Sequence, residues 1–110
     1  GKTVLYAPDQ DYGLNKSIVV DFFGHPSATI SAPFKLINAT SAKPYFVNSY
    51  YDHGCLIVDI EEINFDYEDR FKFMQSLNVH IEQKIRSHPH EYLWQHRRFK
   101  STMGKDKLYK

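Results

Sequence analysis

The residues best suited to binding chemistry lie near the end of the chain, between Leu93 and Lys100. This segment reads Leu-Trp-Gln-His-Arg-Arg-Phe-Lys. The planar guanidinium groups of Arg97 and Arg98 match the oxygens of phosphate, and His96 and Lys100 add further donors. Its aromatic residues favour the boundary between water and an apolar phase. The segment therefore predicts a surface that binds phosphate while it lies against apolar material.

The charge distribution supports an anionic partner at this end of the chain. The net charge of the 110 residues is only +1, but residues 1–95 carry 8 Lys and Arg against 12 Asp and Glu, and residues 96–110 carry 6 against 1. Such a basic tail is short of the strongly basic character of a nucleic-acid-binding domain, so no nucleic acid partner is expected. The alternative to phosphate is a structural ion pair with an acid of the same chain, such as Glu91.

A second group of polar residues, Asp9 and Asp11, follows the first apolar run. One interpretation is a plain turn, in which Asp hydrogen-bonds the local backbone and Gly13 supplies a positive φ. Another is a metal site, because Asp-x-Asp occurs in EF-hand loops and in metal-dependent glycosyltransferases. The EF-hand interpretation fails because the twelfth position is Val20 instead of Glu. The turn and the glycosyltransferase interpretations stay open.

Composition limits the class of protein. A hydrophobic content of 42% and an aromatic content of 15% over 110 residues indicate one folded domain, or part of one, with a modest core. The single cysteine, Cys55, excludes an internal disulfide framework and is expected in the core. No apolar run approaches the roughly 20 residues that a membrane-spanning helix needs.

Hydrophobic patterns in the first half predict two strands and a helix. The apolar run 3–7 predicts a buried strand, and the β-branched run 17–23 predicts a second. Ser27 is expected to cap a helix over residues 27–40, with a kink or a late start at Pro33.

The second half predicts a hairpin and a long helix. Runs 45–51 and 55–60 flank an Asp-His-Gly turn signal and predict a β-hairpin. Apolar residues at three- and four-residue spacing predict an amphipathic helix over about residues 67–86, capped by Asp66. A short helix is expected over residues 90–96. This order of elements implies a layered α/β unit.

Two segments of the chain resemble motifs of the bacterial lipid A biosynthesis acyltransferases, the late lauroyl and myristoyl enzymes. Tyr92 to Lys100, Tyr-Leu-Trp-x-His-Arg-Arg-Phe-Lys, is similar to the C-terminal signature of that family. Tyr6 to Gly13, Tyr-Ala-Pro-Asp-Gln-Asp-Tyr-Gly, is similar to its Pro-Asp-x-Asp loop, and Phe22-Phe23-Gly24 with Ala28-Thr29 is similar to the segment that follows. The spacing agrees from Thr3 to about Lys100.

The resemblance implies a fold and an organisation. Residues 1–110 are expected to be the C-terminal portion of a single acyltransferase domain, an α/β sandwich of the glycerolipid acyltransferase type with a layered mixed sheet and flanking helices. The chain starts at Gly1 without Met, so the upstream catalytic segment and membrane anchor are expected to be absent from it.

The resemblance also implies a function. It implies transfer of a fatty acyl chain from an acyl carrier protein thioester to a hydroxyl of a phosphorylated glucosamine lipid, at the membrane surface on the cytoplasmic face of the bacterial inner membrane. Asp9 and Asp11 would support the active site, Arg97 and Arg98 would bind substrate phosphate with His96 and Lys100, and no metal or organic cofactor is implied. A glycosyltransferase fragment and a non-catalytic module that binds anionic lipid are the alternatives.

Acyl transfer to a hydroxyl requires a base, which the family supplies as a His followed four or five residues later by an acid. Among the six histidines, only His53 with Asp59 approaches this spacing, and it follows the Pro-Asp-x-Asp loop whereas the family's pair precedes it. The base is therefore expected outside the chain, and the chain alone is expected to be inactive. His80 is expected to be exposed on the long helix, and no metal role is expected for His88 and His90.

Overall fold

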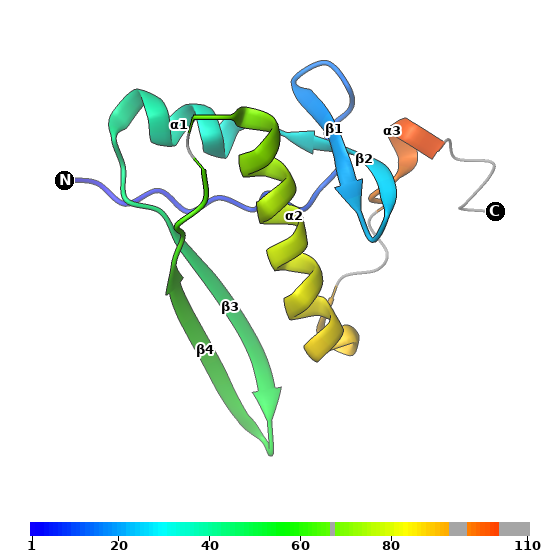
Figure 1. Cartoon of the computed structure of the whole chain (residues 1–110). Helices are drawn as coiled ribbons and strands as arrows, with labels where there is room; N and C mark the ends of the chain where they lie inside the picture. The colour runs from blue at the N-terminus through cyan, green and yellow to red at the C-terminus, as the bar shows by residue number, and fades with distance from the viewer. Residues whose placement is uncertain (67, 93–96, 104–110) are drawn as a thin grey trace.

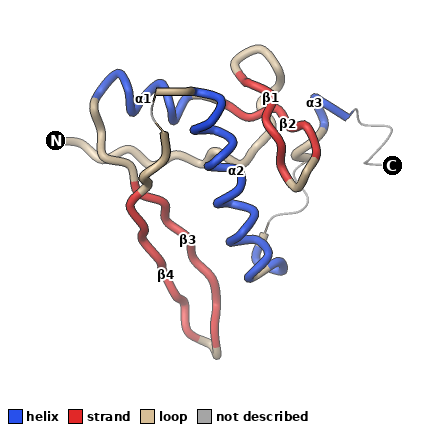
Figure 2. The backbone as a smooth tube through the Cα atoms, viewed as in Figure 1, coloured by secondary structure: helices blue, strands red, loops and turns tan. Residues whose placement is uncertain are grey.

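The protein is described by a computed structural model that covers residues 1–66, 68–92 and 97–103. It is a mixed α/β structure in which helix α2 lies between two β-hairpins (Figure 1). Each hairpin is a separate two-stranded antiparallel sheet (Figure 2). Within the described residues the strands therefore do not form the single layered sheet that the order of elements suggested. No helix of this described part is both long and apolar enough to span a membrane.

The first hairpin pairs β1 (Ser17–Phe22) with β2 (His25–Ile30). Its two turn residues, Phe23 and Gly24, have φ values of 51° and 75°, the left-handed backbone that a tight two-residue hairpin turn requires. The first strand confirms the prediction for residues 17–23. The second strand corrects the predicted helix over residues 27–40.

Helix α1 (Ala32–Thr40) begins only after β2 ends, so Ser27 is a strand residue and not a helix cap. Pro33 lies in the first turn of α1, where its missing N–H costs no hydrogen bond. The late start predicted at Pro33 is confirmed. Ser27, Ala28 and Thr29 are fully buried, which three consecutive strand residues can be only when both faces of the strand are covered.

The second hairpin pairs β3 (Tyr45–Asp52) with β4 (Cys55–Glu62) and confirms the predicted hairpin. His53 and Gly54 form its two-residue turn, with φ values of 49° and 78°. Cys55, expected in the core, is exposed beside this turn. The hairpin extends away from the rest of the chain (Figure 1), so its far end has no core to enter.

Helix α2 (Arg70–Ser87) confirms the predicted long helix but begins later than expected. Its cap is Asp69, which accepts a hydrogen bond from the backbone N–H of Lys72 at 3.1 Å. Asp66 instead accepts from the N–H of Glu68 in the preceding turn. The helix ends at Ser87, and the 3₁₀ helix η1 (Pro89–Glu91) follows it. The remainder of the short helix expected at 90–96 falls on residues 93–96, outside the described residues.

The hydrophobic core lies between α2 and the first hairpin. The apolar face of α2 packs against β1 and the segment after β4, and the buried members of this cluster are Val20, Phe22, Ile63, Phe73, Met74, Leu77, Ile81 and Ile85. The α2 members recur at three- and four-residue spacing, which places them on one face of the helix.

The predicted strand over residues 3–7 is wrong for this structure. The segment is extended but not paired, and Leu5 is 89% exposed. A strand requires a partner for its backbone N–H and C=O groups, and the described strands pair only within their own hairpins.

The position of the α2 cap can be tested with two matched substitutions. We expect Asp69→Ala to lower the free energy of unfolding by about 1 kcal/mol, because the first turn of α2 loses its side-chain acceptor. Asp66→Ala should cost less than half as much, since its carboxylate serves only a local turn. Urea denaturation of the 110-residue chain measures both, and an equal cost would contradict the assignment.

Candidate functional site

The C-terminal segment 97–103 runs along β2, with its last residues in the short helix α3 (Lys100–Met103). Arg98 attaches this segment to the first hairpin. Its side chain is buried, and only 3% of the residue is exposed. Its guanidinium donates to the carbonyl of Ala28 at 2.6 Å and to the hydroxyl of Thr29 at 2.9 Å. The guanidinium carbon also lies 5.2 Å from the ring centroid of Phe22, where the ring face attracts a cation.

A buried polar network continues from Arg98 into helix α2. The Thr29 hydroxyl also accepts a hydrogen bond from the amide of Asn78 at 3.1 Å and donates to the carbonyl of Ser27 at 3.2 Å. The amide of Asn78 donates in addition to the carbonyl of Asp21 in β1. Arg98 is therefore connected to both strands of the first hairpin and to α2.

Asp11, near the N-terminal end of the chain, hydrogen-bonds to the same C-terminal segment. Its carboxylate accepts from the hydroxyl of Ser101 at 2.6 Å and from the backbone N–H of Ser101 at 2.8 Å. It also accepts from the N–H of Gly13 at 2.8 Å, and Gly13 has a φ of 89°. The turn expected at this position is confirmed, but the carboxylate additionally makes a contact across 90 residues of sequence.

The environment of Asp11 favours its ionised form. Burial alone would raise the pKa of this carboxyl, but hydrogen bonds from the Ser101 hydroxyl, the Gly13 and Ser101 backbone and the nearby charge of Lys100 hold the pKa below its ordinary value. The contact between Asp11 and Ser101 is therefore strongest when the carboxylate is charged.

These contacts bring together the two segments that carried the family resemblance. Asp11 belongs to the first, and Arg98 and Lys100 belong to the second. Arg97 and Lys100 are exposed residues on either side of Arg98, which is buried. His96 lies outside the described residues.

An apolar cleft of about 1070 Å³ lies between the N-terminal segment, α1, β3 and α2. Its volume is at the upper end of the range usual for small-molecule sites. Asp9, which is half-buried, is on its lining. The candidate site thus consists of a cleft with Asp9 and Glu91 among its lining residues, and of two exposed basic residues on the segment that Asp11 contacts.

The histidines contribute no base with the family's spacing within the described residues. His53 contacts Asp52 at 2.7 Å in the exposed hairpin turn, while Asp59 lies opposite Asn48 in the strands. The residues that the structure describes contain no group of three or more His, Cys, Asp and Glu side chains arranged to hold a metal ion.

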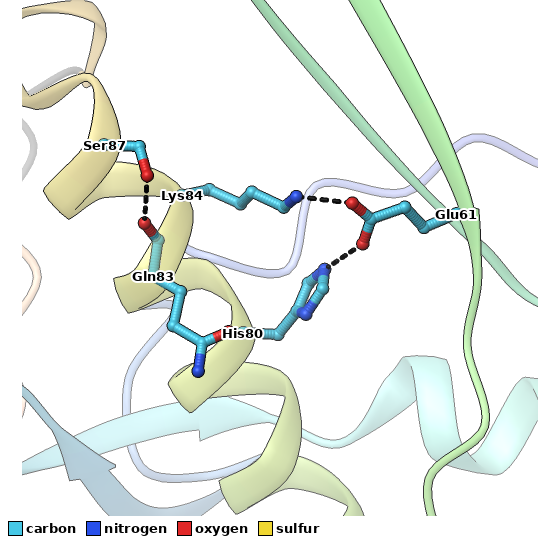
Figure 3. A network of polar contacts seen from close by, with 5 residues as sticks. All are labelled: Glu61, His80, Gln83, Lys84 and Ser87. Atoms are coloured by element: carbon cyan, nitrogen blue, oxygen red, sulfur yellow. Dashed lines mark hydrogen bonds and ion pairs between the residues drawn. The ribbon is translucent and has the colours of Figure 1, made fainter.

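His80, expected to be exposed, is instead part of a polar network that joins the second hairpin to α2 (Figure 3). Glu61 of β4 contacts His80 at 3.0 Å and Lys84 at 2.5 Å. His80 and Lys84 are four residues apart and so share one face of the helix. The hydrogen bond from Lys84 is the main cause that lowers the pKa of Glu61. The edge of the Phe46 ring packs against His80 with centroids 4.6 Å apart.

Sequence reasoning missed Ser101, Thr29 and Asn78, which complete the contacts of Asp11 and Arg98. Asn78 left a signal, because it is a polar residue on the apolar face of α2, where a buried side chain needs hydrogen-bond partners. Thr29 lies in the Ala28-Thr29 pair of the family resemblance, but nothing local pointed to its contacts, and Ser101 left no signal, since its partner is distant in sequence.

Comparison with known proteins identifies the family. A family model described as bacterial lipid A biosynthesis acyltransferase matches residues 1–101, and the chain belongs to this family. It is similar to the lipid A biosynthesis palmitoleoyltransferase of Escherichia coli (strain K12), with 32% identity over 117 residues that cover 99% of this chain and 37% of the relative. The lauroyltransferase of the same organism is 31% identical over 106 residues, or 92% of this chain and 35% of the relative.

A lipid A biosynthesis acyltransferase of Haemophilus influenzae is 28% identical over 96 residues, which cover 86% of this chain and 30% of the relative. The chain therefore spans about a third of the length of these curated relatives.

The buried position of Arg98 generates the first prediction from the site. We expect Arg98→Lys to lower the free energy of unfolding of the 110-residue chain by about 2 kcal/mol, because one ammonium group cannot reproduce the paired donors to Ala28 and Thr29. Arg97→Lys, at an exposed position, should change it by less than about 0.5 kcal/mol. Thermal melting of both variants provides the measurement, and equal melting temperatures would contradict the buried role of Arg98.

The depressed pKa of Asp11 predicts a dependence of stability on pH. The stabilisation from this carboxylate is fully present above the ordinary pKa of Asp, about 3.9, and is lost as the pH falls through the lower pKa of the folded state. We expect Asp11→Asn to be less stable than the wild type at pH 6 and the difference to shrink toward pH 2. Urea denaturation between these pH values tests this, and a difference independent of pH would show that the charge of Asp11 is unimportant.

Proposed function

We propose that this chain forms the C-terminal part of an acyltransferase that transfers a fatty acyl chain to a hydroxyl of a lipid A precursor. Family membership over residues 1–101 supports the reaction class. The observation that carries the proposal for the site is the contact of Asp11 with Ser101 at 2.6 Å and 2.8 Å. Because Ser101 directly follows the second motif segment, this contact holds the two segments together. The two family motifs are thereby held against each other in the fold.

The finer proposal concerns donor, acceptor and location. The acyl donor is an acyl carrier protein thioester, and the acceptor hydroxyl belongs to an acyl chain of a phosphorylated glucosamine disaccharide. The enzyme acts at the cytoplasmic face of the bacterial inner membrane, and its domain is a glycerolipid acyltransferase-like α/β sandwich. A phosphorylated acceptor is consistent with two exposed cationic residues, Arg97 and Lys100, in one short segment that the buried Arg98 attaches to the first hairpin.

The residues of this chain have different roles in the proposed reaction. Arg97 and Lys100, with His96, bind phosphate of the acceptor or of the carrier protein's phosphopantetheine. Arg98 was predicted to share this role, but its side chain is buried and donates to Ala28 and Thr29, so we assign it to positioning its neighbours. Asp11 holds the segment, and Asp9 faces the apolar cleft.

The chemical step requires a group that this chain is not expected to supply. A base takes the proton of the acceptor hydroxyl, the hydroxyl oxygen attacks the thioester carbonyl, and the thiolate leaves. The family's His and acid pair precedes the Pro-Asp-x-Asp loop, so the base belongs to the portion of the relatives that this chain does not match.

The two alternative functions have no specific support in the structure. A glycosyltransferase would use Asp9 and Asp11 as metal ligands, but both oxygens of Asp11 accept hydrogen bonds from Ser101. A module that only binds anionic lipid would need none of the contacts that join the two motif segments. Dependence of any transfer on Mn²⁺ would favour the glycosyltransferase.

The proposal predicts that activity depends on joining this chain to the rest of a family domain. The 110-residue chain alone should show no transfer from acyl carrier protein to a lipid A precursor, because it lacks the base. A chimera in which this chain replaces the matched part of the E. coli lauroyltransferase should be active. Radiolabelled acyl transfer measures both, and transfer by the isolated chain that scales with its concentration would refute the missing base.

The same chimera tests the residue roles. We expect Asp9→Asn to reduce kcat at least tenfold without lowering the melting temperature. Arg97→Ala with Lys100→Ala should raise KM, and added salt should weaken the contribution of these exposed cations. Lys72→Ala, which removes an exposed cation at the start of α2, is the matched control. Unchanged kinetics in both site variants would contradict the assignment.

A further inference from the structure

The second hairpin presents its more apolar face to solvent. In a hairpin, successive side chains point to opposite faces. The face toward α2 is half-buried and mixes apolar and polar side chains, which are Phe46, Tyr50 and Ile57 with Asn48, Asp59 and Glu61. The opposite face is 51–66% exposed at its apolar positions, which are Tyr45, Val47, Tyr51, Leu56, Val58 and Ile60. A one-sided sheet in a stable monomer normally has the reverse arrangement.

This apolar face continues into the N-terminal segment and the cleft. Tyr45 and Val47 line the cleft from β3, and residues 1–9 line it from the other side. Within that segment Val4 and Leu5 are strongly exposed, and no described strand pairs with it. We call the outer hairpin face together with residues 3–7 the hairpin surface. An apolar surface of this kind marks an interaction site.

The charges beside the hairpin surface narrow the choice of partner. Neither strand of the hairpin contains a Lys or Arg, while the two strands contain Asp52, Asp59, Glu61 and Glu62. An anionic lipid surface attracts cations and repels such a hairpin. Of these acids only Glu62 alternates onto the outer face, where it pairs with Lys43 at 3.3 Å, so the outer face itself is almost without net charge. The two exposed tyrosines suit a protein interface.

We propose that the hairpin surface is covered by the portion of a family acyltransferase domain that this chain does not match. Relatives extend over about three times the matched length, since the match covers 37% and 35% of two of them. The covering portion must present an apolar face to the hairpin. It must also contain a strand whose backbone hydrogen-bonds to residues 3–7. These residues would then form the strand that their sequence pattern predicts. The same polypeptide or a separate one can supply this portion.

The inference rests on family membership and not on the proposed activity, so its test measures stability and binding. Val58→Lys with Ile60→Lys places two charges on the outer hairpin face. In the isolated 110-residue chain both positions face water, and we expect the melting temperature to change by less than about 2 °C, as for ordinary surface substitutions. In a chimera in which this chain replaces the matched part of the E. coli palmitoleoyltransferase, we expect a loss of at least about 10 °C, because two charges become buried.

Val79→Lys is the matched control, since Val79 is 41% exposed on α2 and lies outside the hairpin surface. It should leave the chimera unchanged. Hydrogen exchange should show the amides of residues 3–7 protected in the chimera and unprotected in the isolated chain. If the chimera does not fold, co-purification of the tagged chain with the co-expressed unmatched portion of the relative replaces it, and the lysine pair should reduce the recovered complex at least tenfold.

Three outcomes would overturn the inference. In the first, the lysine pair changes the melting temperature of the chimera as little as that of the isolated chain, or it leaves the amount of recovered complex unchanged. The second is self-association of the isolated chain in sedimentation that the lysine pair abolishes, which would assign the surface to a second copy. The third is binding of the isolated chain to phosphatidylglycerol vesicles that the same pair abolishes, which would assign it to lipid.

Discussion

The structure depends on satisfying the free backbone edges of the first hairpin. A two-stranded hairpin is marginal in water because each strand leaves one edge unpaired. The turn is closed by the pair Phe22 and His25. From there hydrogen-bonded and non-hydrogen-bonded pairs alternate along the strands, so the N–H and C=O of Asp21 point away from β2. Gln75 of α2 meets this edge twice, since it accepts from the Asp21 N–H at 2.8 Å and donates to the Asp21 carbonyl at 3.0 Å. Glu82, also in α2, accepts a hydrogen bond from the backbone N–H of Phe23 in the hairpin turn.

The opposite edge is covered by the C-terminal segment. The carbonyls of Pro26 and Ala28 point away from β1, and they accept from the Thr102 hydroxyl and the Arg98 guanidinium at 2.6 Å each. Pro26 fits this edge because it has no N–H to leave unpaired. The hairpin is therefore complete only when α2 and residues 97–103 are both in place.

This arrangement explains how one short segment can be both structural and functional. The interior contacts of Arg98 fix the backbone on either side of it, which leaves Arg97 and Lys100 to present charge at the surface. Asp11 fixes the following residue, Ser101, from the far end of the chain. An arginine inside a basic motif is easily assigned to ligand binding, but its exposure decides between binding and positioning. The sequence pattern does not contain that information, because the partners of Arg98 are about 70 residues away.

What could be predicted from sequence follows the range of the interactions involved. The second hairpin and α2 were predictable, because a two-residue turn signal and a helical apolar stripe are local patterns. Strand β2 was not, since Ser27 to Thr29 are small residues, two of them polar, that contacts from α2 and from Arg98 bury. For residues 3–7 the local pattern favours a strand, but no described strand pairs with them.

The two hairpins consequently differ in how firmly they belong to this part of the fold. The first is enclosed at both edges and contributes Val20 and Phe22 to the core. The second is attached where Glu61 meets His80 and Lys84, where the Tyr50 ring stacks on His88 at 3.8 Å, and where Phe46 packs against the edge of the core. These polar and aromatic contacts fix the orientation of the second hairpin relative to α2. The larger apolar area on its outer face contributes no stabilising free energy until it is removed from water. The attachment to α2 thus holds the second hairpin in position for a partner surface. Burial of its outer face then stabilises the contact between the hairpin and that partner.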